Sequence, residues 1–368
     1  MALDLGRGKG AAPANPLPMS TSRLRALFAV LAGVLVMSSV SAAEGASACG
    51  RPRPERRSPA AGFPNDPLFP RQWNLDQIHA PEAWAAGATG KGAVIAIIDT
   101  GVDVRHPDLG GRIVLPRGAE CAYVLDDLGH GTHVAGVAAA STDNSRGIAG
   151  VAPGAMVMPF GPYGNPADRI RIAADSGADV INMSWTSIEA SPVDPLHPDL
   201  TEALDYAWEK GVVLVAAAGN NRWPNCEHPA SHPKVLCVAS TDSTGRPSHL
   251  SNLPNKVEGV TLRAPGGVGV GGCDATDDIW STLPPSSTYG SCGAFPGYEP
   301  LGGTSMAAPH VAGVAAMLSG LGFSRDRIVE CIVSTAFNPV TGGRGMQDPV
   351  YGYGILDAAS AVKECRAG

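Results

Sequence analysis

Three residues with the side chains of a nucleophilic catalytic site lie in separate segments of the sequence. Asp99 ends the apolar run AVIAIID, His130 lies in GHGTHVAGVAAA, and Ser305 lies in the Gly-rich segment GGTSMAAPHVAG. A serine hydroxyl becomes a good nucleophile when a histidine takes its proton, and that histidine needs a carboxylate to fix its tautomer. Taken singly, such an aspartate, histidine or Gly-Thr-Ser turn more often caps a turn or a helix. Together they predict a site for nucleophilic hydrolysis.

The surrounding pattern predicts the elements that hold these residues. Apolar, β-branched runs alternate with helical patterns, which is typical of a parallel sheet with helices on both faces. In such sheets, sites form beyond the C-terminal ends of the strands. We therefore expect a single α/β domain, a three-layer doubly wound and mostly parallel sheet. The expected strands are 93–99, 179–184, 212–219 and 234–240, and the expected helices are 132–140, 166–176, 199–211, 304–319, 325–336 and 355–365.

The composition fits one large domain behind an export signal. The chain has 368 residues, of which 44% are hydrophobic and 17% are charged, with no internal repeat and no charged linker in its middle. Arg23 and Arg25 precede the apolar run 26–37, and small residues follow, as in a secretory signal peptide. We expect cleavage after Ala43. The predicted organisation is a signal peptide (1–43, with 1–18 as an upstream-start extension), a Pro/Arg-rich linker or short pro-segment (44–63) and a folded domain (64–368).

The charge balance argues against nucleic acid as a partner. Loss of residues 1–43 removes four basic residues and one acidic residue, so the formal charge changes from −7 to −10. The basic cluster RPRPERR at 51–57 is Pro-rich and typical of an exposed spacer. The run 26–37 is too short for a stable membrane span. A lipoprotein acylated at Cys49 is a weaker alternative, because residues 46–48 lack a large aliphatic side chain.

The eight cysteines predict disulfide bonds. An even number in an exported chain is typical of a disulfide framework, although the sequence alone permits many pairings. No pair has the CxxC spacing of a zinc site or a redox motif. The spacings favour Cys226 with Cys237, Cys273 with Cys292 and Cys331 with Cys365, which leaves Cys49 for Cys121.

Three long motifs resemble the signature motifs of the subtilisin-like serine proteases. They are IIDTGVDVRHPDL (97–109), GHGTHVAGVAAA (129–140) and GGTSMAAPHVAG (302–313), in the Asp, His, Ser order of subtilisin. The resemblance covers residues 64–362, and it implies a subtilisin-like peptidase domain at 64–368. Shorter matches lie at 147–153, 177–185, 213–220 and 351–362.

The resemblance assigns roles to single residues. It implies that Asp99 orients His130, that His130 is the base for Ser305, and that His133 is structural. It also implies that the side-chain amide of Asn220, with the backbone N–H of Ser305, stabilises the oxyanion of the tetrahedral intermediate.

The expected substrate pocket departs from the family pattern. The resemblance places its two walls at Ser184, Trp185 and Thr186 and at Ala217, Ala218 and Gly219. Trp185 and Thr186 stand where the family usually has Leu-Gly, whereas the small alanine walls suggest an apolar preference. The segment 160–170 is shorter than in relatives, and its prolines cannot donate hydrogen bonds to an extended peptide.

Calcium is the cofactor that the resemblance implies. Side-chain oxygens would come from Asp66, Asp108 and Asn144, and hard oxygen ligands of this kind suit calcium. The alternative is a solvated loop with ordinary turn-forming residues. Main-chain oxygens would come from positions near Ser141, Arg146 and Ile148.

These observations predict a secreted serine endopeptidase that acts as a monomer on protein or peptide substrates. Two alternatives remain: a secreted binding protein that keeps the fold but has lost turnover, and a processing protease of narrow specificity. The stretch between Ala43 and Pro64 is too short for an independently folded prodomain. Folding would then proceed without a prodomain, with help in trans, or with a short segment.

Overall fold

The computed structural model describes residues 64–118, 124–186, 198–269, 272–273, 275–287, 289, 292–293 and 295–368. The predicted signal peptide and linker, residues 1–63, lie outside this part of the chain.

A six-stranded sheet forms the centre of the fold, with the strand order β2-β1-β3-β4-β5-β6. All five pairings between neighbouring strands are parallel. The expected strands are present, and two additional strands, β2 and β6, extend the sheet at its two edges. The strands are β1 (Val94–Ile98), β2 (Met156–Phe160), β3 (Val180–Met183), β4 (Val213–Ala217), β5 (Val235–Thr241) and β6 (Thr261–Pro265).

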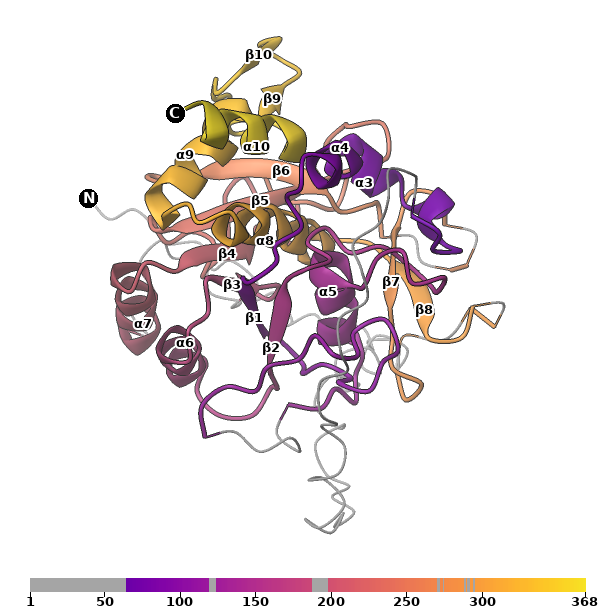
Figure 1. Ribbon diagram of the computed structural model, residues 1–368. Helices are drawn as coiled ribbons and strands as arrows, with labels where there is room; N and C mark the ends of the chain where they lie inside the picture. The colour runs from indigo at the N-terminus through magenta and orange to yellow at the C-terminus, as the bar shows by residue number, and fades with distance from the viewer. Residues whose placement is uncertain are drawn as a thin grey trace, which may run out of the picture. The chain divides into compact units, whose positions relative to one another are not determined.

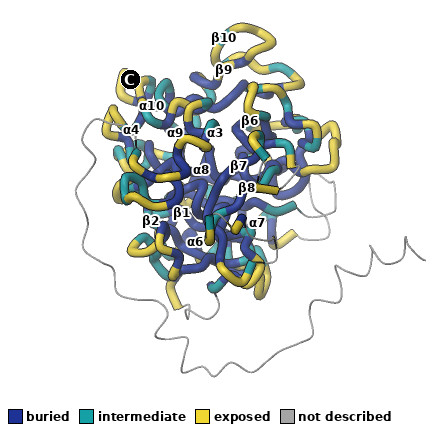
Figure 2. The backbone as a smooth tube through the Cα atoms, turned by 90° about the vertical axis from the view of Figure 1, so that its right-hand side faces the viewer, coloured by how far each residue is buried: buried dark blue, intermediate teal, exposed yellow. Residues whose placement is uncertain are grey.

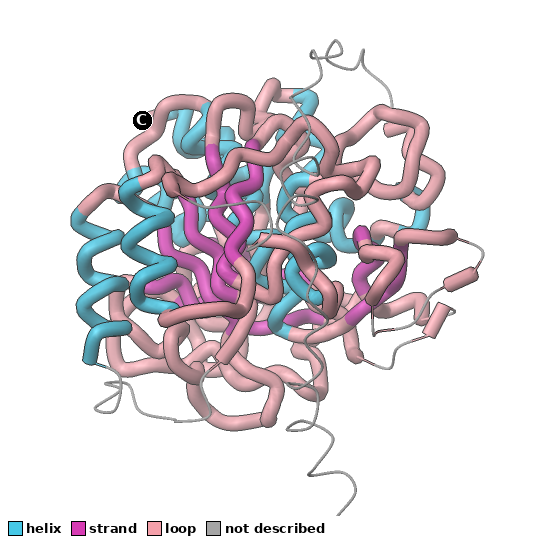
Figure 3. The backbone as a smooth tube through the Cα atoms, turned by 90° about the horizontal axis from the view of Figure 1, so that it is seen from below, coloured by secondary structure: helices cyan, strands magenta, loops and turns pink. Residues whose placement is uncertain are grey.

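Successive side chains of the central strands face different layers of helices. In β1, Ile95 and Ile97 belong to the core cluster that includes helices α5 and α8, whereas Ala96 and Ile98 belong to the cluster that includes α6 and α7. Figure 1 shows α6 and α7 side by side, and Figure 3 shows strands between helices. Because both faces are covered, the strands are buried over nearly all of their length and mostly apolar. The doubly wound fold is therefore confirmed.

The helices agree in position with most of the expected ones. The helix expected from residue 132 begins at His130, and the one expected from residue 355 begins at Ala358, because the Asp357 side chain caps it by accepting a hydrogen bond from Ser360 N–H. The three short helical segments before β1 were not expected. The helices are η1 (Phe69–Arg71), α3 (Trp73–Gln77), α4 (Ala80–Ala85), α5 (His130–Ala139), α6 (Pro166–Asp175), α7 (Pro198–Glu209), α8 (Thr304–Gly320), α9 (Arg325–Thr335) and α10 (Ala358–Ala367).

Helix α8 is a buried helix of the domain, and the tube beside its label in Figure 2 is mostly dark blue. Its buried positions extend over nearly all of its length, so it packs between the sheet and the helices around it. Two small antiparallel pairs lie outside the main sheet: β7 (Ile279–Thr282) with β8 (Tyr298–Leu301), and β9 (Phe337–Asn338) with β10 (Gly343–Arg344).

Three of the four predicted disulfides are confirmed. The bonded pairs are Cys226–Cys237, Cys273–Cys292 and Cys331–Cys365. The fourth predicted pair, Cys49 with Cys121, lies outside the described residues.

Candidate active site

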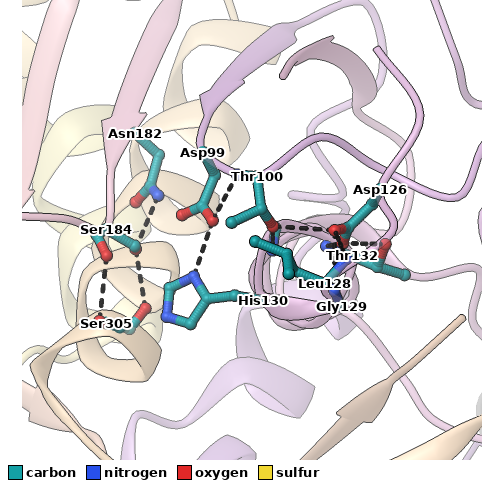
Figure 4. Close-up of polar contacts among 11 residues, drawn as sticks. Asp99, Thr100, Asp126, Leu128, Gly129, His130, Thr132, Asn182, Ser184 and Ser305 are labelled. Atoms are coloured by element: carbon teal, nitrogen blue, oxygen red, sulfur yellow. Dashed lines mark hydrogen bonds and ion pairs between the residues drawn. The ribbon is translucent and has the colours of Figure 1, made fainter. Parts of the chain in front are cut away.

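The three candidate catalytic residues come from three elements that meet beyond the end of the sheet (Figure 4). Asp99 directly follows β1, His130 is the first residue of α5, and Ser305 is the second residue of α8. Asp99 is buried, whereas His130 and Ser305 are partly exposed. The structure thus brings together residues that are far apart in the sequence.

Asp99 fixes the orientation of His130. Oδ1 of Asp99 lies 2.7 Å from Nδ1 of His130 and also accepts a hydrogen bond from Thr100 N–H at 2.8 Å. A carboxylate accepts, so Nδ1 carries the proton and Nε2 is left to act as a base. Burial lowers the pKa of His130, but the charge and the hydrogen bond of Asp99 outweigh burial and raise that pKa above its ordinary value.

Ser305 is held by a reciprocal pair of hydrogen bonds with Ser184. The Ser305 hydroxyl donates to the Ser184 carbonyl at 3.0 Å, and the Ser184 hydroxyl donates to the Ser305 carbonyl at 2.8 Å. The Ser305 carbonyl is available because the residue four positions later, Pro309, has no N–H to donate. In Figure 4 the ring of His130 lies between Asp99 and Ser305. A change of the Ser305 rotamer would therefore direct its hydroxyl toward the ring.

Asn220 presents a side-chain amide next to the start of α8. Its Oδ1 accepts hydrogen bonds from the Thr304 N–H at 2.9 Å and from the Thr304 hydroxyl at 3.0 Å. The carbonyl side of the amide is thereby fixed, which leaves the Nδ2 group to donate. Asn220 is exposed, so this donor is accessible to a substrate.

The two expected pocket walls follow neighbouring strands. The segment Ser184–Thr186 comes after β3, the segment Ala217–Gly219 lies at the end of β4, and these two strands pair in parallel. Ala217 and Ala218 are fully buried. Trp185 packs partly against the core cluster of α6 and α7, so its indole belongs in part to the core.

Asp126 organises the N-terminus of α5, a role that the sequence analysis did not foresee. Its carboxylate accepts hydrogen bonds from the N–H groups of Gly129 at 2.7 Å and Thr132 at 2.9 Å. The Thr100 hydroxyl donates to Asp126 at 2.9 Å and accepts from Gly131 N–H at 2.8 Å. This network joins the end of β1 to the start of α5, and so sets the position of His130 relative to Asp99. Asp126 begins the segment DDLGHGTHVAG (126–136), and an aspartate just before a helix is the signal that could have marked it as a cap.

Two other histidines are structural. Nε2 of His133 lies 3.0 Å from the Glu299 carbonyl, and burial lowers the pKa of His133 to about 3. His310 lies 2.8 Å from both the Met306 carbonyl and the Asn74 amide, and burial lowers its pKa to about 4. Both rings are therefore neutral core residues at ordinary pH.

The carboxylates of Asp66 and Asp108 are buried beside the Asn144 loop. Asn144 links them, because its N–H donates to Asp66 Oδ1 at 3.1 Å and its Nδ2 donates to Asp108 Oδ1 at 2.7 Å. Burial raises the pKa of Asp66 to about 6, and the nearby charge of Asp108 contributes to this shift. Burial also raises the pKa of Asp108. Two buried carboxylates beside an amide fit a hard cation, which would compensate their charge.

The three main-chain positions of the calcium hypothesis lie in the same cluster. Ile148 N–H donates to Asp108 Oδ2 at 3.1 Å, Arg146 N–H donates to Asn144 Oδ1 at 2.8 Å, and Ser141 N–H donates to the Asp108 carbonyl at 2.8 Å. The structure thus brings all six predicted residues together, and their role as ligands stays a prediction.

Comparison with known proteins decides the family. The model of the subtilase family, Peptidase_S8, matches residues 90–354, which include Asp99, His130 and Ser305. The chain belongs to the subtilase family. Thermitase of Thermoactinomyces vulgaris is 41% identical to this subtilase over 290 residues, which are 74% of this chain and 91% of that protein. The thermophilic serine proteinase of Bacillus sp. (strain AK1) is 37% identical, over 82% of this chain and 70% of that protein.

Solved structures give the same assignment. A protease from Pseudoalteromonas arctica PAMC 21717 superimposes with a TM-score of 0.68 at 31% identity, over 83% of this chain and 100% of that chain. Fervidolysin from Fervidobacterium pennivorans superimposes with a TM-score of 0.65 at 32% identity, over 81% of this chain and 46% of that chain. This subtilase is therefore a serine protease with the subtilisin-like fold. Among the helices that the structure describes, none has the length and hydropathy to cross a membrane.

Proposed function

We propose that this subtilase is a secreted serine endopeptidase in which Asp99, His130 and Ser305 form the catalytic triad. The observation that carries the proposal is the 2.7 Å hydrogen bond between Asp99 and His130, with the Ser305 hydroxyl at the start of α8 beside the ring. A buried carboxylate that holds an imidazole next to a serine is the arrangement that activates a serine for acyl transfer.

Each residue then has a defined step. The Ser305 Oγ attacks the substrate carbonyl carbon while its proton passes to Nε2 of His130, and the charge of Asp99 stabilises the resulting imidazolium. The oxyanion accepts hydrogen bonds from Asn220 Nδ2 and from Ser305 N–H. His130 then gives the proton to the leaving amine, the C–N bond breaks, and an acyl-enzyme forms. Water, deprotonated by His130, attacks the ester carbon; the bond from that carbon to Ser305 Oγ then breaks, and His130 returns the proton to Ser305 Oγ, which releases the acid and restores the serine.

The proposed substrates are proteins or peptides that bind between the segments Ser184–Thr186 and Ala217–Gly219. All proposed catalytic groups belong to one chain, which supports action as a monomer. Three disulfides support export to an oxidising compartment, since such bonds persist outside the cytosol. The predicted signal peptide, residues 1–43, supports the same route.

Calcium is proposed as a structural cofactor. Asp66, Asp108 and Asn144 would supply side-chain oxygens, with main-chain oxygens near Ser141, Arg146 and Ile148. The ion would neutralise two buried carboxylates that belong to segments distant in sequence, and so would join the N-terminal part of the domain to the loop after α5.

The deciding experiment is to treat the purified mature protein with a fluorophosphonate probe and to locate the adduct by mass spectrometry. We expect the probe on Ser305, and we expect Ser305→Ala to abolish both labelling and peptide hydrolysis. A folded wild-type protein that neither labels nor cleaves a peptide library would favour the binding-protein alternative. Labelling with cleavage confined to a few sequences would favour the processing protease.

A further inference from the structure

A buried carboxylate lies directly behind one proposed pocket wall. Glu227 is 1% exposed, and its backbone N–H donates to the carbonyl of Ala218 at 2.9 Å. A Cβ placed on Gly219 would lie 2.6 Å from Oε1 of Glu227. The carboxylate therefore packs against the bare Cα of Gly219, at the place where a side chain of this wall would otherwise stand.

The Glu227 side chain is held by neutral groups. Nδ2 of Asn221 and Nδ2 of Asn252 both donate to its Oε1, at 2.7 Å and 2.8 Å. In the part of the chain that the structure describes, these are the hydrogen bonds of the carboxylate, and no Lys, Arg or His forms an ion pair with it. A buried charge is costly unless a cation pairs with it. Glu227 thus presents a buried carboxylate that a cation would complement.

Asn221 connects the carboxylate to the surface beside Asn220. It follows Asn220, the proposed oxyanion donor, and it is exposed. Because its side-chain amide donates to Glu227 at 2.7 Å, the carboxylate lies one hydrogen bond away from an exposed residue next to Asn220. The adjacent wall residues Ala217 and Ala218 are small and apolar, and their side chains are packed in the core clusters. The main chain of this segment would therefore run beside the methylene stem of a long basic side chain.

We propose that Glu227 is the specificity-determining residue of the pocket and selects substrates with lysine or arginine immediately before the scissile bond. The substrate stem would lie along the alanine wall, and its cation would reach the second carboxylate oxygen of Glu227, while the two asparagines hold the first. This preference replaces the apolar one expected from the alanines alone. The inference rests on the proposed function and names its substrate class.

The kinetic test compares peptide anilides that differ only in lysine, arginine or phenylalanine before the scissile bond. Wild-type kcat/KM is expected to be at least about 10-fold higher for the two basic peptides. Glu227→Gln keeps an oxygen acceptor for both asparagines but removes the carboxylate. The kcat/KM for the basic peptides, divided by the kcat/KM for the phenylalanine peptide, should therefore fall about 10- to 100-fold. Glu258→Gln, at an exposed carboxylate, is the matched control and should leave the ratio unchanged.

An equilibrium test needs no turnover. Benzamidine, a small aromatic cation, should bind the Ser305→Ala variant, and the added change Glu227→Gln should weaken its binding at least about 10-fold. Equal benzamidine binding to both variants would overturn the proposal, as would a wild-type preference for phenylalanine. A Gln variant that loses thermal stability without a change of ratio would assign Glu227 a purely structural role. Failure of the proposed function would look different: Ser305 would stay unlabelled while benzamidine binding remained.

Discussion

Ser184 and Ser305 each donate a side-chain hydrogen bond to the main-chain carbonyl of the other, at 2.8 Å and 3.0 Å. The pair joins the end of β3 to the first turn of α8. The Ser184 hydroxyl also accepts a hydrogen bond from Asn182 Nδ2 at 2.9 Å, so it satisfies two buried groups at once.

Ser184→Ala should lower stability by about 1–3 kcal/mol, because the Ser305 carbonyl and the Asn182 amide lose their buried partner. Denaturant unfolding measures this loss. Adding Pro309→Ala restores an N–H group four residues after Ser305. This N–H can donate to the Ser305 carbonyl within the helix. The double variant should therefore be more stable than the two single effects predict, and simple additivity would contradict the role given to Pro309.

Asn220→Ala should lower kcat about 100- to 1,000-fold, the loss known for removal of the oxyanion-hole asparagine of subtilisin. The KM should change much less, because the donor acts on charge that develops in the transition state. Steady-state kinetics on one peptide substrate measure both kcat and KM. Thr304→Val, which removes one of the two hydrogen bonds that hold Asn220 Oδ1, should show a smaller loss of the same kind. A pure KM effect in both variants would remove Asn220 from the oxyanion site.

The pH dependence of kcat/KM should report the ionisation of His130. Its pKa is raised above the ordinary value by Asp99, and the base must be unprotonated to accept the serine proton. Activity should therefore be lost as the pH falls through this raised pKa. Asp99→Asn removes the negative charge, so the acid limb should shift to lower pH while kcat falls about 10,000-fold. An acid limb that stays in place in the Asn variant would show that another group controls it.

Chelation should destabilise the wild-type protein if calcium joins Asp66 and Asp108. An ion that binds the folded chain alone stabilises it by an amount that grows with the ratio of free calcium to its dissociation constant. EDTA should thus speed heat inactivation and expose the segment around Asp66 to proteolysis. Asp108→Asn should weaken the response to added calcium and leave Ser305 labelling intact. Equal inactivation rates in EDTA and in calcium would show that these residues are ordinary turn formers.

The mature chain should contain no free thiol. Three disulfides are present among the described residues, and Cys49 and Cys121 are predicted to form the fourth. Alkylation of the unreduced, denatured protein followed by mass spectrometry should therefore add no label. Two labelled thiols at Cys49 and Cys121 would show that this pairing is wrong.

The sequence by itself determined the architecture and the identity of the candidate catalytic residues. Buried parallel strands are recognisable because both of their faces are covered, so their residues form nearly continuous apolar runs such as AVIAIID. The motifs around Asp99, His130 and Ser305 are long, and their order along the chain matched one family. Three cysteine pairs were predicted correctly because their members are close in sequence.

Only the tertiary structure decided how these residues are held. Asp126 lies 26 residues from Thr100, yet the two side chains form the network that sets His130 against Asp99. The Ser305 carbonyl accepts a hydrogen bond from the hydroxyl of Ser184, 121 residues away, because Pro309 has no N–H to donate to it within the helix. No motif marked Glu227, and its proposed role rests on its contact with Gly219 and on the neutral groups around it. Local patterns fix which strands and helices form, whereas contacts between their ends depend on how those elements pack.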